Sequence, residues 1–504
     1  MIAGEETGVL PPPLHSSTDG SFGGALAPLP PQVQDVLRRL HAAGYKAHLV
    51  GGCVRDRLLG RPPHDWDVAT NARPEQVLPL FVHCVPTGVA YGTVTVFAGE
   101  PDRHEPVQVT TYRKEMGSRD LRHPEKVVFS DSVEEDLARR DFTINAIAYD
   151  PWAEVLVDPV HGRQDLERRL IRAVGNPDQR FDEDALRLLR AVRLATELRP
   201  YHFRLESKTR TAIRRHAPQV EYLSRERIRD EFLRLLAAPD PQWGLWELQD
   251  LDLLFRIIPE LAATHHFPQD KPGVPTLLDH LIRAVQNVPP DPILRLAALL
   301  HDIAKPATAT MSPDGQVHFY CHDTLGAEMA SRIAASLRLP RSQADRLASL
   351  IRMHMVDGTD VGKKALRRWL GQYGERWIRD LLALRRADNI ASGVSPDEPN
   401  PFIDRLEDLL DEVLHEQKAF RTQDLCLDGR QVMAELGVGP GPMVGAALRY
   451  LLEQVLDDPS LNTPDQLRRL LHDWWQRTRS SPVPAVHRRQ RGPASTSPPP
   501  GLPD

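Results

Sequence analysis

Apolar residues follow two different patterns along the chain, and the change between them falls near residue 150. From 31 to 150, short runs rich in β-branched and aromatic residues are bounded by turn residues, which is typical of strands. The segment 30–44 instead repeats apolar residues every three or four positions and ends at Gly44, which predicts an amphipathic helix. We therefore expect a compact α/β unit with a small sheet, whose strands lie within 46–52, 65–70, 92–98, 107–112 and 144–150.

Beyond Pro151, leucine- and alanine-rich segments with helical spacing dominate as far as Trp475, as in DEDALRLLRAVRLATEL (182–198). This succession predicts the α+β class, with a small mixed-sheet head followed by an extended all-helical body. The expected parts are a tail at 1–30, a head at 31–150, a helical neck and body at 151–260, a histidine-bearing helical domain at 261–400, a helical tail at 401–478 and an end segment at 479–504.

The composition is that of an ordinary globular protein with several domains, since 504 residues are too many for one core. Both ends are rich in Pro, Gly and Ser, so we expect disordered tails. No apolar run approaches the roughly 20 residues that cross a bilayer, and the start lacks a basic and apolar leader. Four cysteines lie far apart without Cys-x-x-Cys spacing, which predicts a reduced, cytoplasmic protein. The lack of a long apolar run predicts that the protein has no membrane partner.

Charge is informative only locally. The net charge of −6 gives no overall signal for nucleic acid, but the segment 161–230 holds 17 Arg and Lys against 11 Asp and Glu. Solvated helix faces explain most charge runs. Directly behind a candidate metal site, a basic segment also suits a phosphate backbone.

Asp65 and Asp67 form that candidate metal site. In a strand, residues two apart face the same way, so the two carboxylates project together while Trp66 points into the packed side. Such a pair suits Mg²⁺, a hard ion that prefers oxygen ligands and can assist in-line phosphoryl transfer. A β-turn with two exposed acids is the alternative for an isolated Asp-x-Asp.

Gly51 and Gly52 precede the two acids within twenty residues. Glycine lets backbone N–H groups approach a triphosphate closely, and the guanidinium of Arg55 can add a fork of donors. A strand, Gly-Gly, Arg-Asp and Asp-x-Asp in this order are far more specific than any one of them alone.

The stretch HLVGGCVRDRLLGRPPHDWDVAT (48–70) resembles the signature of class II tRNA nucleotidyltransferases, which include bacterial CCA-adding enzymes and poly(A) polymerases. The similarity continues in the same order through 86–96, 109–113, 134–148, 180–195 and 226–236. The resemblance implies that Asp65 and Asp67 bind catalytic Mg²⁺ and that Arg140 is catalytic. It also implies nucleotide contacts for Gly51, Gly52, Arg55, Arg139, Arg140, Asp141, Asn145, Glu183, Asp184, Arg187 and Arg190.

The base-selecting role that the resemblance gives to Glu183, Asp184 and Arg187 is chemically sound. On a helix, either acid can reach the same site as Arg187. Cytosine and adenine both present an amino donor beside a ring-nitrogen acceptor, which a carboxylate and a guanidinium satisfy. Uracil and guanine have the reversed polarity and would leave polar groups unpaired. The alternative for an isolated Glu-x-x-x-Arg is a surface salt bridge.

Gln108 departs from a common pattern. Many nucleotidyltransferases of this fold carry a third acid on the neighbouring strand, near 109–113, where this chain has Gln108. The general base and the number of metal ions therefore stay open on the sequence alone.

A second metal signature runs from about Thr276 to Asp388, where histidines and aspartates recur on helical elements. Polar side chains at the end of an apolar helix cost free energy unless they are bonded or ligated. The series resembles the HD superfamily of metal-dependent phosphohydrolases. That pattern implies a ligand set of His280, His301, Asp302 and Asp388, with His322 and His354 as candidate additions. Such ligands suit Ni²⁺, Mn²⁺, Fe²⁺, Co²⁺ or Mg²⁺.

We therefore expect a Mg²⁺-dependent CCA tRNA nucleotidyltransferase that adds CMP and AMP from CTP and ATP to the 3′ end of tRNA, with protein side chains choosing the base. A CC-only or A-only enzyme and a poly(A) polymerase are alternatives within the class. From other classes come an HD-type phosphohydrolase whose head only binds RNA and an RNA-binding module without chemistry. The sequence predicts no oligomeric state.

Overall fold

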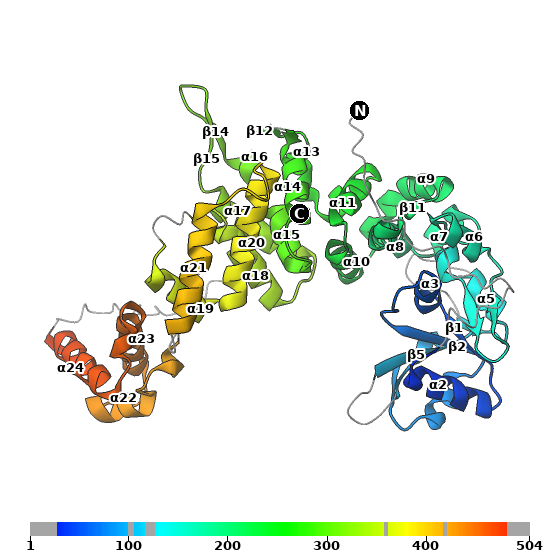
Figure 1. Cartoon of the computed structure of the whole chain (residues 1–504), viewed down its shortest axis with the longest axis horizontal. Helices are drawn as coiled ribbons and strands as arrows, with labels where there is room; N and C mark the ends of the chain where they lie inside the picture. The colour runs from blue at the N-terminus through cyan, green and yellow to red at the C-terminus, as the bar shows by residue number, and fades with distance from the viewer. Residues whose placement is uncertain are drawn as a thin grey trace, which may run out of the picture. The chain divides into compact units, whose positions relative to one another are not determined.

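The computed structural model describes residues 28–98, 105–115, 127–271, 273–356, 361–416 and 421–480 (Figure 1). The expected disordered tails fall almost entirely outside these residues. Two compact units are present. The first comprises the described residues up to Val356 together with Asp380–Asn400, and the second comprises those of Asp357–Arg379 and from Pro401 onward.

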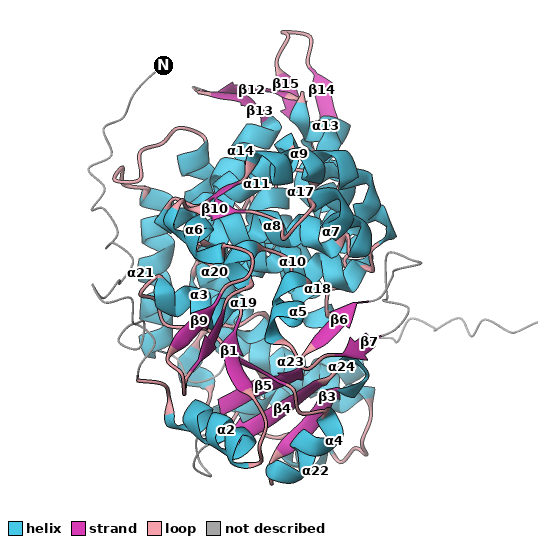
Figure 2. Ribbon diagram, turned by 90° about the vertical axis from the view of Figure 1, so that its right-hand side faces the viewer, coloured by secondary structure: helices cyan, strands magenta, loops and turns pink. Residues whose placement is uncertain are grey.

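The head is built on a seven-stranded sheet with the order β3-β4-β5-β2-β1-β8-β9. All neighbours in it are antiparallel except β2 and β5, and Figure 2 shows β5, β4 and β3 side by side. A separate hairpin pairs β6 with β7. The strands are β1 (Ala47–Val50), β2 (Trp66–Thr70), β3 (Cys84–Gly88), β4 (Thr93–Ala98), β5 (Glu105–Thr111), β6 (Arg113–Glu115), β7 (Val127–Phe129), β8 (Ala148–Asp150) and β9 (Val155–Val157).

Helix α2 (Pro31–Ala42) packs against this sheet through the predicted apolar face, on which Val33, Val36, Leu37 and Leu40 are buried. Burial of such a face is what stabilises a surface helix. The other helical turns of the head are α3 (Gly52–Leu58), α4 (Pro74–Val77), η1 (Leu78–Leu80), η2 (Val89–Tyr91), α5 (Val133–Ala138) and η3 (Thr143–Asn145).

The neck that follows is helical and centred on α8, most of whose side chains are buried and which packs against α10 and α11. Two very short strands, β10 (Leu170–Ile171) and β11 (Arg204–Leu205), pair in parallel. The helices are α6 (Gly162–Glu167), α7 (Pro177–Glu183), α8 (Leu186–Glu197), η4 (Arg199–Tyr201), α9 (Ser207–His216), η5 (Ala217–Tyr222), α10 (Arg225–Ala237), α11 (Pro241–Asp250), α12 (Leu254–Ile257) and η6 (Pro259–Leu261).

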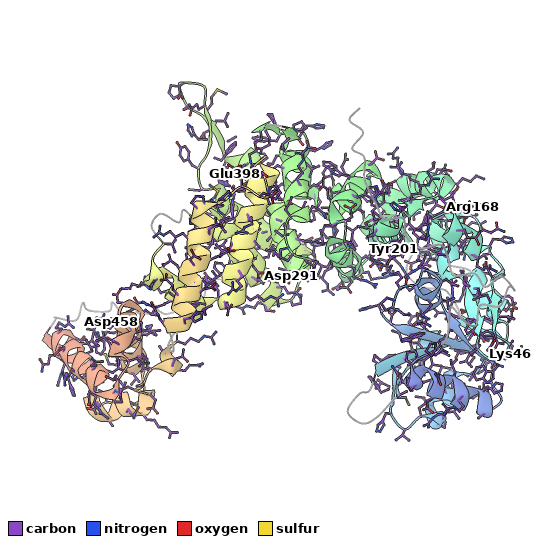
Figure 3. All side chains as sticks on the ribbon, in the orientation of Figure 1. Lys46, Arg168, Tyr201, Asp291, Glu398 and Asp458 are labelled. Atoms are coloured by element: carbon purple, nitrogen blue, oxygen red, sulfur yellow. The ribbon has the colours of Figure 1, made fainter. Side chains whose placement is uncertain are left out.

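The histidine-bearing region packs α14 on α15 and α17 on α18. Asp291, labelled in Figure 3, caps α15 by accepting the N–H groups of Ile293 and Leu294. Its elements are α13 (Ala262–His265), β12 (Pro268–Lys271), β13 (Val274–Thr276), α14 (Leu277–Gln286), α15 (Pro292–Leu300), α16 (Lys305–Thr308), β14 (Ala309–Met311), β15 (Val317–Phe319), α17 (His322–Ser336), α18 (Arg341–Met353) and α20 (Glu375–Ala391), whose first turns belong to the second unit.

The second unit is helical and has its own core, which includes Val432, Ala447, Leu451, Leu467 and Leu471. Its helices are α19 (Lys363–Gln372), α21 (Pro401–Glu416), η7 (Thr422–Asp424), α22 (Gly429–Leu436), α23 (Pro442–Asp457), η8 (Pro459–Leu461) and α24 (Pro464–Ser480).

The expected fold class is confirmed, because a mixed sheet at the start of the chain is followed by a helical body. All five predicted strands of the head are present, whereas the short β3, β6, β7 and β9 were missed. Within the described part of the chain, no helix combines the length and the apolar character that crossing a membrane requires.

Candidate active site

Asp65 and Asp67 lie at the start of the central strand β2. Asp65 directly precedes the strand, Trp66 is its buried first residue, and both carboxylates line one cavity. Burial, and then the charge of Asp65, raise the pKa of Asp67 to about 6, while Arg140 and Arg190 lower it. Because two like charges meet at a partly buried place, the pair fits a divalent cation.

The turn at Gly51 and Gly52 lies close to the carboxylate of Asp67. Gly51 has φ = +77°, and a Cβ there would come within 2.9 Å of Nη1 of Arg140 and 3.7 Å of Oδ2 of Asp67. Helix α3 begins at Gly52, and Nη1 of Arg55 donates to Oδ1 of Asn145 at 2.6 Å. Glycine at position 51 is therefore required both by its backbone conformation and by the approach of Arg140.

A methyl group at position 51 tests this requirement. We expect Gly51→Ala to lose about 1–3 kcal/mol of stability from the left-handed backbone and to raise the KM for nucleotides about tenfold, because Arg140 must move. Gly44→Ala is the matched control, since Gly44 has φ = +84° with nothing within 4 Å of its Cβ position. It should lose stability without a change in KM, as measured by thermal unfolding and steady-state kinetics. Equal KM effects in both variants would contradict the contact with Arg140.

Arg139 and Arg140 are held by one carboxylate that the sequence reasoning missed. Asp136 is 1% exposed; its Oδ1 accepts from Nη2 of Arg139 at 2.6 Å and its Oδ2 from Nη2 of Arg140 at 3.0 Å. Burial opposes ionisation of Asp136, but Arg140 and Arg139 hold its pKa below the ordinary value. The i, i+3 and i, i+4 spacing in EEDLARRD is the signal that could have identified it.

Asp141 orients another guanidinium. Its Oδ2 lies 2.9 Å from Nη2 of Arg190, and its Oδ1 accepts the backbone N–H of Phe142 at 2.8 Å and, at 3.4 Å, an N–H of the Asn145 side chain. Asp141 is buried, yet Arg190 holds its pKa below the ordinary value. Asn145 thus links Asp141 to Arg55, so that Arg55, Asn145, Asp141 and Arg190 form one connected network.

The continuous helix expected through Glu183, Asp184 and Arg187 is wrong. Helix α7 ends at Glu183, Asp184 is extended with φ = −153°, and α8 starts at Leu186. The side chain of Asp184 accepts the N–H of Leu186 and pairs with Arg227 of α10 at 2.8 Å. Such side-chain bonds to the backbone compete with a helix and break it here.

The break nevertheless brings Asp184 and Arg187 to one cavity wall. Nη1 of Arg187 donates to Oε2 of Glu183 at 2.7 Å, and its Nη2 donates to the carbonyl of Arg139 at 3.2 Å. Glu183 therefore fixes the orientation of the Arg187 guanidinium. Of these two side chains, that of Arg187 lines the cavity.

Gln108 lies beside the aspartate pair. In the parallel pairing of β2 with β5, it stands opposite Asp67, and its side chain lines the same cavity as Asp67. An amide thus occupies the place on the neighbouring strand where a third acid was considered.

Two cavities meet at the side chains of Asp67 and Arg190, which line both. The first, of about 400 Å³, is lined among others by Gln108, Arg139, Arg140, Asp141, Asp184 and Arg187. The second, of about 480 Å³, is lined among others by Gly52, Arg55, Arg61, His64, Asp65 and Asn145.

Six side chains of the kinds that can bind a metal ion meet in the histidine-bearing region. His280, His301 and Asp388 lie on one side of Asp302. The Nε2 atom of His280 is 3.1 Å from Oδ1 of Asp388, and the Nε2 atom of His301 is 3.4 Å from Oδ2 of Asp302. These four offer ligand atoms within 4.8 Å of one another. Burial opposes ionisation, but the neighbouring histidines hold the pKa of both aspartates well below the ordinary range.

His322 and His354 occupy the other side of Asp302. Their Nε2 atoms lie 3.3 and 3.4 Å from its Oδ1, and within the described residues all three atoms are buried without a hydrogen-bond partner. Each Nδ1 faces a backbone carbonyl, that of Phe319 at 2.7 Å and that of Ile351 at 2.6 Å. Because a carbonyl only accepts, the Nδ1 carries the proton and the Nε2 lone pair is left to ligate a metal.

Comparison with known proteins agrees with this architecture. Family models match for the poly A polymerase head domain over 47–172, for the probable RNA and SrmB-binding site of polymerase A over 202–264, and for the HD domain over 283–393. The CCA-adding enzyme of Latilactobacillus sakei is 34% identical over 436 residues, which are 86% of this chain and 95% of that protein. That of Lactobacillus delbrueckii is 47% identical over 209 residues, a match that spans 42% of this chain and only 51% of that protein.

Solved structures extend the comparison to the fold. The Bacillus stearothermophilus CCA-adding enzyme in complex with CTP aligns with a TM-score of 0.62 and 28% identity, over 90% of this chain and 99% of that one. The Thermotoga maritima CCA-adding enzyme complexed with tRNA shares the fold at 18% identity and a TM-score of 0.50, over 90% of this chain and 98% of that one.

The head and its acid pair thus place the chain in the class of polymerase-type nucleotidyltransferases that carry an HD domain. Because the Latilactobacillus match covers nearly the whole of both proteins, the chain belongs to the family of CCA-adding enzymes.

Proposed function

We propose that the chain is a Mg²⁺-dependent CCA tRNA nucleotidyltransferase, which adds CMP and AMP from CTP and ATP to the 3′ end of tRNA. The observation that carries the proposal is the meeting of the Asp65–Asp67 pair with the cavity lined by Asp184 and Arg187. Relatives named as CCA-adding enzymes support it. Four free cysteines support a cytoplasmic location.

The nucleotide lies across the two cavities. Its base is held by Asp184 and Arg187, and its triphosphate passes Asp67 and Arg190 toward Gly52 and Arg55. The Arg187 guanidinium donates to the ring nitrogen of cytosine or adenine, and the Asp184 carboxylate accepts from the amino group. Uracil and guanine would leave both protein groups unpaired in a partly buried site.

The reaction forms a bond from the 3′-oxygen of the RNA to the α-phosphorus and breaks the α–β phosphoanhydride, so pyrophosphate leaves. Asp65 and Asp67 would hold Mg²⁺, which would supply charge stabilisation for the attacking and leaving oxygens. Arg140, held by Asp136, lies against the glycine turn and next to Asp67, where it meets the α-phosphate. Asp141 and Arg139 face the sugar.

Defined tRNA ends test the activity and separate it from its alternatives. Purified protein is given transcripts that end before CCA, after the first C or after CC, each with one labelled nucleotide. We expect CTP to extend the first two and ATP only the third, with addition stopping after one A. Unlimited A addition would indicate a poly(A) polymerase, and failure at one step would indicate a CC-only or A-only enzyme. Incorporation of UTP or GTP would contradict the base assignment.

We propose a second, metal-dependent phosphohydrolase activity in the HD domain. The six side chains around Asp302 support it, because a carboxylate whose two oxygens face different histidine sets can join two divalent ions. His280, His301 and Asp388 would hold one ion, and His322 and His354 would hold the other. Ni²⁺, Mn²⁺, Fe²⁺, Co²⁺ and Mg²⁺ are all compatible with imidazole and carboxylate ligands.

Removing the shared carboxylate separates the two activities. We expect Asp302→Asn to weaken metal binding by more than about 100-fold, since even groups outside the ligand shell are worth 10–100-fold. Nucleotide addition should be unchanged, because neither cavity of the head is lined by a residue of this cluster. Metal content is measured by mass spectrometry, with Asp345→Asn, at an exposed position of α18, as the control. Retention of wild-type metal content in Asp302→Asn would contradict the site.

A further inference from the structure

A third cavity of the head, of about 460 Å³, shares no lining residue with the two cavities described above. Its wall comes from the end of α2, the start of β1, the start of α5 and the turn after β8. Lys46, labelled in Figure 3, lies on this wall. The cavity therefore has room for a ligand that neither nucleotide addition nor the histidine cluster uses.

His48 is a buried polar residue of this wall and is only 6% exposed. The register of β1 with β8 places Leu49 opposite Tyr149, which brings His48 next to Asp150. Nε2 of His48 lies 3.7 Å from Oδ2 of Asp150, which is too long for a hydrogen bond. Because both residues line the cavity, each keeps a polar atom for a ligand.

The hydroxyl of Tyr112 determines which nitrogen of His48 carries the proton. It lies 2.5 Å from Nδ1 of His48, is buried, and has no other partner within the described residues. Burial raises the pKa of Tyr112 above its ordinary value and lowers that of His48, so both groups are neutral near pH 7. A buried O–H group needs an acceptor, so the hydroxyl donates to Nδ1. The imidazole proton is then on Nε2, which offers a donor to the cavity.

Asp150 supplies an acceptor beside this donor. Its Oδ1 accepts the backbone N–H groups of Trp152 and Ala153 at 2.9 and 3.1 Å, which leaves Oδ2 for a ligand. A donor and a carboxylate oxygen 3.7 Å apart complement an amino group that lies next to a ring nitrogen. Adenine and cytosine present this pair of groups on one edge, whereas uracil presents the reversed polarity.

Two aromatic rings line the same cavity. His41, near the end of α2, stacks on Trp152 with the ring centres 4.3 Å apart and the planes at 16°. Trp152 is 42% exposed, so part of its π surface is open. Every nucleobase has a π face that can stack on such a surface.

The charge of the wall allows a second kind of ligand, because the carboxylates of Asp131, Glu134 and Asp150 lie on it together with Lys46. An excess of carboxylates alone would favour a cation, such as an arginine or lysine side chain of another protein. Such a cation has donors but no acceptor for the Nε2–H group of His48. A base that carries both an amino group and a ring nitrogen satisfies both protein groups.

We propose that this cavity binds a nucleobase of the adenine or cytosine type, with His48 donating to the ring nitrogen and Asp150 accepting from the amino group. The base stacks on the pair of His41 and Trp152. A free nucleoside and an unpaired base of RNA carry the same edge, so both are sources of this ligand. The site is separate from nucleotide addition and does not depend on it.

Photolabelling with 8-azidoadenosine locates the base without turnover. The full chain carrying Arg187→Ala is the background, since it lacks the guanidinium that holds a base in the first cavity. We expect label at His41 or Trp152, found by mass spectrometry, with protection by adenosine and cytidine but not by uridine.

Substitutions in the same background test the two kinds of contact. Asp150→Asn and Trp152→Ala should each weaken adenosine binding about tenfold or more in calorimetric titration. At position 150, asparagine keeps the oxygen that caps the turn and turns an NH₂ group toward the amino group of the base. Tyr222→Ala, at an exposed aromatic position outside the cavity, is the control. Thermal unfolding shows whether each variant is folded, and Trp152→Ala decides alone if Asp150→Asn is not.

Competition with single-stranded oligo(A) RNA separates the two sources. Protection by oligo(A) at a lower concentration than adenosine would assign the site to RNA, and the reverse order would assign it to a free nucleoside. Either result supports the site. Label confined to other peptides, equal protection by uridine, or unchanged adenosine affinity in folded Trp152→Ala would overturn it. Protection by arginine amide but not by adenosine would indicate a cationic partner and would also overturn it.

Discussion

Replacement of Asp67 by Asn is expected to lower nucleotide addition by about a thousandfold or more, since a charge-stabilising group at the transition state is worth several kcal/mol. The variant keeps the shape of the side chain and removes only the charge. Its affinity for tRNA should be unchanged, because the substitution lies in the head and leaves the helical body as it is. Single-turnover rates and filter binding measure the two quantities.

Stability provides a second reading of the same variant. Burial and Asp65 raise the pKa of Asp67 to about 6, so its ionisation opposes folding above that pH, and this penalty disappears as the pH falls toward the ordinary value. Without added metal at neutral pH, Asp67→Asn should therefore unfold at a temperature equal to or higher than wild type. Asp35→Asn on α2 is the control for the head. Loss of activity in Asp67→Asn supports the metal role only if the variant is folded. An Asp67→Asn variant that remains active would refute the metal role.

Replacement of Arg187 by Ala is expected to reduce discrimination between CTP and UTP by about 100-fold or more, because a site built to pair polar groups rejects the wrong base strongly. The guanidinium is fixed by Glu183, by the carbonyl of Arg139 and by that of Arg180, so its direction is set before the nucleotide arrives. Ratios of kcat/KM for CTP, ATP, UTP and GTP on defined tRNA ends measure the effect.

Two further variants make this test specific. Glu183→Gln should have a smaller effect than Arg187→Ala, since Glu183 only holds the guanidinium. Arg215→Ala, which removes an exposed ion pair with Asp178, should change nothing. A uniform loss of rate for all four nucleotides, with unchanged ratios, would show that Arg187 does not choose the base.

The sequence allowed prediction of features that depend on short spacings. Asp65 and Asp67 are two residues apart at the start of a strand, so the local backbone geometry determines the direction of their side chains. Gly51 directly precedes a helix, so its position in a turn is also determined locally. The same holds for the buried face of α2. Each requires only the period of a strand or a helix.

Features that depend on distant partners could not be predicted. The Asp184 carboxylate pairs with Arg227, which lies 43 residues further along the chain, and no local spacing indicates that partner. Asp136 is different, because its partners Arg139 and Arg140 are only three and four residues away, so its spacing offered a signal that the prediction did not use. Arg61 of the head and Arg234 of the neck line the same cavity. This arrangement also depends on the packing of the neck against the head, which no local pattern encodes.

The histidine cluster falls between these cases. The series of histidines and aspartates indicated a metal site, but only the fold places His322 and His354 on one oxygen of Asp302 and His301 on the other.

A crystal structure of the protein with CTP and Mn²⁺, in the absence of RNA, tests the central claim most directly. We expect metal ions about 2.1 Å from carboxylate oxygens of Asp65 and Asp67, with the triphosphate reaching past Gly52 and cytosine against Asp184 and Arg187. Carboxylates without metal beside a bound nucleotide, or a nucleotide bound elsewhere in the chain, would contradict it.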